Sequence, residues 1–126
     1  MRDINEISGI IVDAAMKVHT RLGSGLLESA YQACLHFELQ RRGLKVERQV
    51  DLPIRYDDVL IESGYRLDLV VEDQIVIEIK AVEELHPIHT AQLLSYLKIS
   101  GKRLGLLINF HALHLKDGIK RLANNL

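Results

Sequence analysis

The sequence has one cysteine, no tryptophan and no apolar run of the length that a membrane-spanning helix needs, about 20 residues. Cys34 has no partner in the chain, so an internal disulfide is excluded, and its apolar helical position predicts a small buried side chain. Residues 1–6 carry charges where a secretory signal needs an apolar stretch. We therefore expect a cytoplasmic protein that has no membrane partner.

The chain also lacks an excess of charge of either sign. The 16 Lys and Arg residues oppose 17 Asp and Glu residues, which excludes the strongly basic composition of a dedicated nucleic-acid coat. With only four tyrosines, the chain also lacks the aromatic series of a single-strand stacking platform. Two basic patches remain candidates for nucleic-acid contact, although each is equally typical of solvated helix ends. They are Arg41, Arg42, Lys45 and Arg48 in one, and Lys98, Lys102 and Arg103 in the other.

Repeats, low-complexity segments and flexible linkers are absent, and 126 residues suffice for one hydrophobic core. We expect residues 1–126 to form a single domain. Helical spacing of apolar residues predicts helices over 4–22 and about 26–42. The first should begin with a capping box, and the second should be buried through Leu27, Ala30, Cys34 and Phe37.

Alternation of apolar and polar residues predicts strands in the second third of the chain. The expected strands cover 44–56, with a bend at Pro53, then 59–61 after a turn, 65–71 and 75–82. Pro87 can open a helix that ends at Gly101, and the apolar stretch 103–110 should be a central strand parallel to 75–82. The tail after residue 112 is expected to be short mixed structure. This order predicts an α/β fold with a central mixed sheet flanked by helices.

The stretch IVIEIK, residues 75–80, interrupts an apolar strand with Glu78 and Lys80 on one face. If residues 72–74 form a three-residue loop, Asp68 lies directly opposite Glu78, with Cβ atoms roughly 4.5 to 5.5 Å apart. A two-residue loop would instead pair Asp68 with Ile77 or Ile79. The constellation therefore depends on the turn.

Two opposed carboxylates destabilise a sheet unless a cation or a proton lies between them. Their hard oxygen atoms suit Mg²⁺ or Mn²⁺, and the backbone carbonyl of Ile79 is available as a further ligand. Lys80 would offset charge that develops on a phosphoryl group, which is the chemistry of phosphodiester hydrolysis. The alternative is that Asp68, Glu78 and Lys80 form a salt-bridge cluster on a solvated face, without metal.

Two further motifs accompany this constellation. Residues 25–31, GLLESAY, have the form GxxExxY, and residues 92–96, QLLSY, have the form QxxxY. With Asp68 and the EIK tripeptide in this order, they resemble the GxxExxY family of the PD-(D/E)XK nuclease superfamily over essentially the whole chain. Leu67 stands where the superfamily name has proline, a position at which the motif is loose.

The resemblance implies a restriction-endonuclease-like core and a Mg²⁺-dependent nuclease, with DNA as the commoner substrate. It assigns Asp68 and Glu78 as metal-binding acids and Lys80 as the catalytic lysine. Glu28 would approach the metal directly or through water, and Gln92 and Tyr96 would border the active site. A bare catalytic core of this size would need a targeting partner or a homodimer. A nuclease-fold module that keeps the acids but does not cleave is the alternative.

Several of these residues also have ordinary structural explanations. Glutamate is favoured near helix N-termini, which would account for Glu28, and Tyr31 and Tyr96 suit buried positions with a hydrogen-bonded hydroxyl. His86 and His89 lack further ligands at zinc spacing. His89 lies one turn before Gln92, so it either lines the same cleft or is a surface residue at a helix start.

Overall fold

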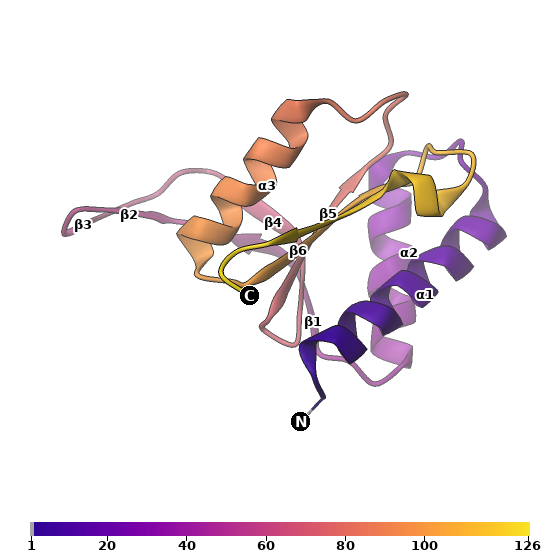
Figure 1. Cartoon of the computed structure of the whole chain (residues 1–126), viewed down its shortest axis with the longest axis horizontal. Helices are drawn as coiled ribbons and strands as arrows, with labels where there is room; N and C mark the ends of the chain where they lie inside the picture. The colour runs from indigo at the N-terminus through magenta and orange to yellow at the C-terminus, as the bar shows by residue number, and fades with distance from the viewer. Residues whose placement is uncertain (1) are drawn as a thin grey trace.

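The computed structural model describes residues 2–126 and shows a mixed β-sheet with helices on both faces (Figure 1). The elements are α1 (Ile4–Leu22), α2 (Glu28–Arg41), β1 (Val46–Asp51), β2 (Ile54–Tyr56), β3 (Val59–Ile61), β4 (Arg66–Val71), β5 (Ile75–Lys80), α3 (Pro87–Ser100), β6 (Leu104–Asn109), the 3₁₀ helix η1 (Leu115–Gly118) and β7 (Ile119–Ala123). None of the helices in this range combines the length and apolar character that crossing a bilayer requires. The predicted α/β class with a central mixed sheet is confirmed.

The central sheet has the strand order β1-β4-β5-β6-β7. Only β5 and β6 run parallel, and α3 forms the connection between them, as the order of strand, helix and strand predicted. β6 is buried along its whole length because strands flank it on both sides and helices cover both faces. The tail, predicted only as mixed structure, supplies β7 at one edge of the sheet.

Two apolar clusters hold the helices against the sheet. α1 and α2 cover the face formed by Ile75, Ile77 and Ile79 of β5, and α3 covers the opposite face around Val76. Glu78 and Lys80 alternate with the isoleucines along β5, so they belong to the α3 face. Gly105 of β6 allows α3 to approach closely, because a Cβ atom there would lie only 3.1 Å from its leucine side chains.

Two predictions about the helices are wrong. Asp3 is the N-cap of α1, yet its side chain makes no capping hydrogen bond. In α2 the expected buried row is exposed: Leu27, Cys34 and Phe37 all face solvent. The helix is rotated so that Tyr31, Leu35 and Leu39 enter the core, where Tyr31 stacks on Phe110 with ring centroids 4.5 Å apart. Apolar residues occur on both faces of α2, so packing alone selects the buried one.

The predicted strand over 44–56 is divided at Leu52 and Pro53, consistent with the bend expected at the proline. The second part forms a separate hairpin of β2 and β3, with a turn at residues 57–58. This hairpin projects from the body of the protein and does not join the central sheet (Figure 1).

Candidate functional site

The β4–β5 hairpin sets the register on which the candidate site depends. The paired residues are Val71 with Ile75, Val70 with Val76 and Leu69 with Ile77. The loop therefore holds the three residues 72–74, and the predicted register is confirmed. One further step along the same register brings Asp68 opposite Glu78.

The backbone pairing of β4 with β5 ends at Leu69 and Ile77. Beyond that point the two carboxylates accept the hydrogen bonds of the backbone N–H groups. The Asp68 N–H donates to Glu78 Oε2 at 2.9 Å, and the Ile79 N–H donates to Asp68 Oδ2 at 2.8 Å. Each acid thereby holds the backbone of the opposite strand, which fixes both side chains. Within residues 2–126, the second oxygens, Asp68 Oδ1 and Glu78 Oε1, accept no hydrogen bond.

Glu78 is buried and Asp68 is half-buried, and this changes their protonation. Burial raises the pKa of Glu78 to about 8, and the negative charge of Asp68 adds to this increase. Burial also raises the pKa of Asp68, against the hydrogen bond from Ile79 and the positive charge of Lys80. Near neutral pH the two acids therefore need a proton or a cation between them.

The donor set at this point fits a hard divalent cation. Two carboxylate oxygens are free of protein hydrogen bonds, and Ile79 lies where β5 has left the β4 ladder, which keeps its carbonyl a candidate ligand. Across residues 2–126, no three side chains of Asp, Glu, His or Cys gather into a group able to hold a metal. An ion bound by Asp68 and Glu78 would therefore complete its shell with backbone and water oxygens, as Mg²⁺ commonly does.

Glu28 reaches the same end of β5 from the first turn of α2. Its Oε2 accepts the Ala81 N–H at 3.3 Å, one residue beyond Lys80. Its negative charge contributes to the raised pKa of both Asp68 and Glu78, as the smallest of the causes. Among residues 2–126 Glu28 does not complete a three-residue metal group, and its approach to a metal, directly or through water, stays a prediction.

Tyr31 fastens the turn from which Glu28 emerges. Its hydroxyl donates to the Gly23 carbonyl at 2.6 Å and accepts the Leu26 N–H at 3.0 Å. The ring itself is fully buried. The tyrosine of the GxxExxY pattern is thus a core residue, and it positions the glutamate of the same pattern.

The helix α3 covers the sheet face to which the two acids belong, and it carries the predicted residues Gln92 and Tyr96. Tyr96 is buried and packs against Tyr65, with ring centroids 5.6 Å apart. Burial raises the pKa of Tyr96, and the charges of Glu78 and Asp68 contribute to the rise. Gln92 is half-buried one turn earlier, and no hydrogen bond of its side chain is found within residues 2–126.

His89 precedes Gln92 on the same side of α3 and is part of the same electrostatic environment. Burial lowers the pKa of His89, and the positive charge of Lys80 lowers it further. Its Nδ1 accepts the His86 N–H at 3.1 Å, so the remaining proton of the neutral ring belongs on Nε2. His89 is thus a half-buried residue at the start of α3, where its ring caps the His86 N–H, and a place beside Gln92 in a cleft stays a prediction.

Asn109 is a buried polar residue that the sequence analysis overlooked. It pairs with Lys80 across β5 and β6, and its amide makes two hydrogen bonds with the Val82 backbone, at 2.9 Å and 3.1 Å. These bonds hold the chain that leaves β5 immediately after Lys80. The signal in the sequence that could have indicated this role is an asparagine at the end of an otherwise apolar strand.

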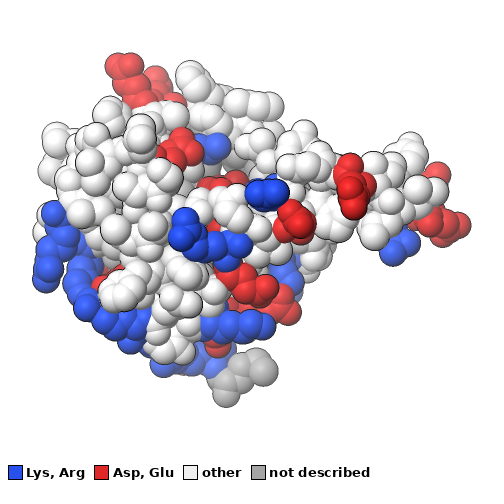
Figure 2. All heavy atoms as spheres, turned by 180° about the vertical axis from the view of Figure 1, so that it is seen from behind, with Lys and Arg blue, Asp and Glu red and all other residues white. Residues whose placement is uncertain are grey.

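The predicted basic patches are partly neutralised within the chain. Arg41 and Arg42 both pair with Glu38, Arg42 also pairs with Asp13, and Lys102 pairs with Asp73. Figure 2 shows Lys and Arg side chains gathered along one side of the molecule, away from the projecting hairpin, on which acids are prominent. On this face, Lys and Arg side chains are therefore most numerous on the side away from the hairpin.

Comparison with known families gives one match. The family model described as the PD-(D/E)XK nuclease superfamily matches residues 5–122, from α1 into β7. No curated protein and no solved structure matches the chain.

Proposed function

Because the chain belongs to the PD-(D/E)XK nuclease superfamily, we propose that it is a metal-dependent nuclease of the GxxExxY family that hydrolyses phosphodiester bonds. We propose DNA as the substrate, Mg²⁺ as the metal with Mn²⁺ as a substitute, and residues 1–126 as one domain of this kind.

The observation that carries this proposal is the pair of acids on the β4–β5 hairpin, of which Glu78 is buried and Asp68 is half-buried. Asp68 and Glu78 are held together by hydrogen bonds to each other's strands, at the cost of a raised pKa. A structural ion pair would set a cation directly against each acid, but within residues 2–126 neither acid has a salt-bridge partner within 4.0 Å. A pair of acids that is largely shielded from solvent and has no balancing cation is typical of a functional site.

The roles of the chain's own residues follow from their positions. Asp68, Glu78 and the Ile79 carbonyl would hold the ion, which when bound would polarise a phosphate oxygen and lower the pKa of a coordinated water. Lys80 would stabilise negative charge on the phosphoryl oxygens. Glu28, which reaches β5 beside Lys80, would orient water through its free oxygen.

Gln92 and Tyr96 would border the substrate on the α3 side. Tyr96 is buried, so its role there would be to shape the cleft and exclude water. The half-buried Gln92 could offer its amide to a phosphate or a base. Asn109 would keep the segment after Lys80 in place.

A non-cleaving nucleic-acid-binding or regulatory module is the second candidate. The chain has a formal net charge of −1, and several of its arginines are bound to its own acids. A module of this kind would bind DNA without metal and without turnover.

The test is cleavage of single- and double-stranded DNA with Mg²⁺ or Mn²⁺ by the parent, by Lys80→Ala and by Lys116→Ala, purified identically. Lys116 is exposed and lies in η1, so it controls for loss of one positive charge. We expect the parent and Lys116→Ala to cleave and Lys80→Ala to lose at least about a hundredfold in rate. Equal cleavage by all three would reveal a contaminating nuclease, and metal-independent binding without cleavage would favour the module.

A further inference from the structure

The β2–β3 hairpin carries its apolar side chains into solvent. We refer to residues 54–62 as the arm. Tyr56 is 68% exposed, Val59 60% and Leu60 58%, and none of them belongs to either core cluster. Hydrogen bonds anchor the arm at its base, where the Leu52 N–H donates to the Tyr65 carbonyl at 2.9 Å and the Ser63 hydroxyl donates to the Leu52 carbonyl.

A two-stranded hairpin by itself is at best marginally stable in water. Three large apolar side chains on such a hairpin therefore call for a covering surface, and aromatic residues such as Tyr56 are typical anchors of protein interfaces. The arm is also acidic. It contains one basic residue, Arg55, and three acids, Asp57, Asp58 and Glu62, which gives it a net charge of −2. This sign disfavours DNA as the partner of the arm.

A matching surface lies between α1 and α2. This α1–α2 groove encloses about 290 Å³, slightly below the roughly 300–1,000 Å³ of small-molecule pockets, and so suits side chains better than a whole ligand. Its apolar lining consists of Val18, Leu22, Ala33, Cys34 and Phe37. Phe37 is 60% exposed there, and it is part of the α2 row that the core leaves uncovered.

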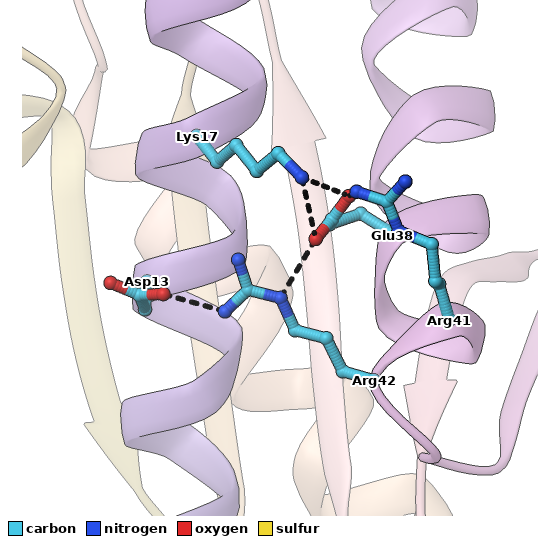
Figure 3. A network of polar contacts seen from close by, with 5 residues as sticks. All are labelled: Asp13, Lys17, Glu38, Arg41 and Arg42. Carbon is cyan, nitrogen blue, oxygen red and sulfur yellow. Dashed lines mark hydrogen bonds and ion pairs between the residues drawn. The ribbon is translucent and has the colours of Figure 1, made fainter.

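The rim of the groove is positively charged. Lys17, Arg21 and Arg41 line it together with the single acid Glu38, which leaves a net charge of +2. Figure 3 shows Glu38 already engaged by Lys17, Arg41 and Arg42, at 3.2, 2.7 and 2.8 Å. Among the residues described, Arg21 has no ion-pair partner, so it is available to an acid from outside.

The arm and the α1–α2 groove lie at opposite ends of the molecule, so one chain cannot bring them together (Figure 1). We propose that the arm of one copy docks in the α1–α2 groove of a second copy. The apolar surfaces then cover each other, and the net charge of −2 meets the net charge of +2. In an antiparallel pair both copies exchange arms through two identical contacts, which closes the assembly with two-fold symmetry.

The first test measures molar mass by light scattering from micromolar to millimolar protein. We expect a concentration-dependent dimer, and Leu60→Asp should raise its dissociation constant by about tenfold or more. Leu113→Asp is the matched control, because Leu113 is 80% exposed and lies outside both surfaces. A monomer throughout this range, or a dimer that Leu60→Asp leaves unchanged, would overturn the proposal.

Charge exchange tests the pairing itself. Asp58→Lys and Arg21→Glu should each weaken the dimer, because each sets two like charges together. A mixture of the two variants should restore it, since each mixed contact then joins opposite charges. If the mixture stays as weak as the separate variants, the arm does not meet the groove.

The single native cysteine permits a direct trap. Cys34 is exposed in the groove, so Leu60→Cys should form an intermolecular disulfide with it under mild oxidation if the docked Cα atoms approach within about 7 Å. Leu113→Cys should not be trapped in this way. Digestion and mass spectrometry of the crosslinked species identify the joined positions, and a link at Leu113→Cys but none at Leu60→Cys would contradict the docking.

Discussion

Glu38 is a buried acid on a helix whose other buried residues are mostly apolar. Its carboxylate accepts hydrogen bonds from Lys17, Arg41 and Arg42, which join α1 to the end of α2 (Figure 3). The hydrogen bond from Arg42 lowers the pKa of Glu38 to about 2, and Lys17 and Arg41 contribute, against the opposing effect of burial. The network therefore stabilises the folded state only while Glu38 is ionised.

We predict that Glu38→Gln lowers the free energy of unfolding by about 1 to 3 kcal/mol at neutral pH. The pKa of Glu38 is depressed from 4.5 to about 2, so its contribution is complete above 4.5 and is lost as the pH falls toward 2. Urea denaturation at several pH values should show the parent and variant converging below pH 4.5. A constant difference across this range would contradict the assignment, and exposed Glu83→Gln is the control.

Cys34 gives a second prediction at this scale. Its thiol is exposed beside Phe37, so a maleimide should label the folded protein at a rate close to that of the unfolded chain. Labelling that requires denaturation would show that the thiol is covered. Measured at low protein concentration, the rate reports the monomer, and slower labelling at high concentration would agree with a docked arm.

At the scale of an element, the turn between α1 and α2 determines where Glu28 lies. We predict that Tyr31→Phe lowers the free energy of unfolding by about 1 to 3 kcal/mol, because it removes the hydroxyl bonded to Gly23 and Leu26 but keeps the stacked ring. Urea denaturation measures this loss. Tyr56→Phe, on the exposed arm, should change stability by less than about 0.5 kcal/mol, and equal losses in the two variants would argue against the bonded turn.

The elements themselves differed in how far their sequence patterns could be trusted. The three-residue loop at 72–74 was predictable as one of two alternatives, because alternation along β4 and β5 allows few registers, and the pairing in the structure selects the one that opposes Asp68 to Glu78. The buried face of α2 was not, because its apolar residues lie on two sides and Tyr31 settles the rotation by stacking on Phe110 of a distant segment. The separation of β2 and β3 from the sheet was signalled only by Pro53.

For the whole molecule, we predict that Mn²⁺ raises the melting temperature of the parent. Ligand at a hundredfold excess over its dissociation constant adds about 2.7 kcal/mol to the free energy of unfolding. Asp68→Asn and Glu78→Gln should each lose this response, while exposed Glu83→Gln keeps it. Absence of any shift in the parent would indicate a cluster of acids without metal, whatever the outcome of the cleavage assay.

The sequence by itself determined the α/β class and the parallel pairing of β5 with β6, because strand alternation and short connections are local properties. It left two lengths open for the turn after β4, and the structure selected the one that opposes Asp68 to Glu78. Only the tertiary structure decided that Glu28 and Asn109 hold the backbone that follows Lys80, since two separate elements bring them there. It also decided that Cys34 and Phe37 face solvent. Spacing along a helix shows which residues share a face, but packing against the rest of the chain selects the face that is buried.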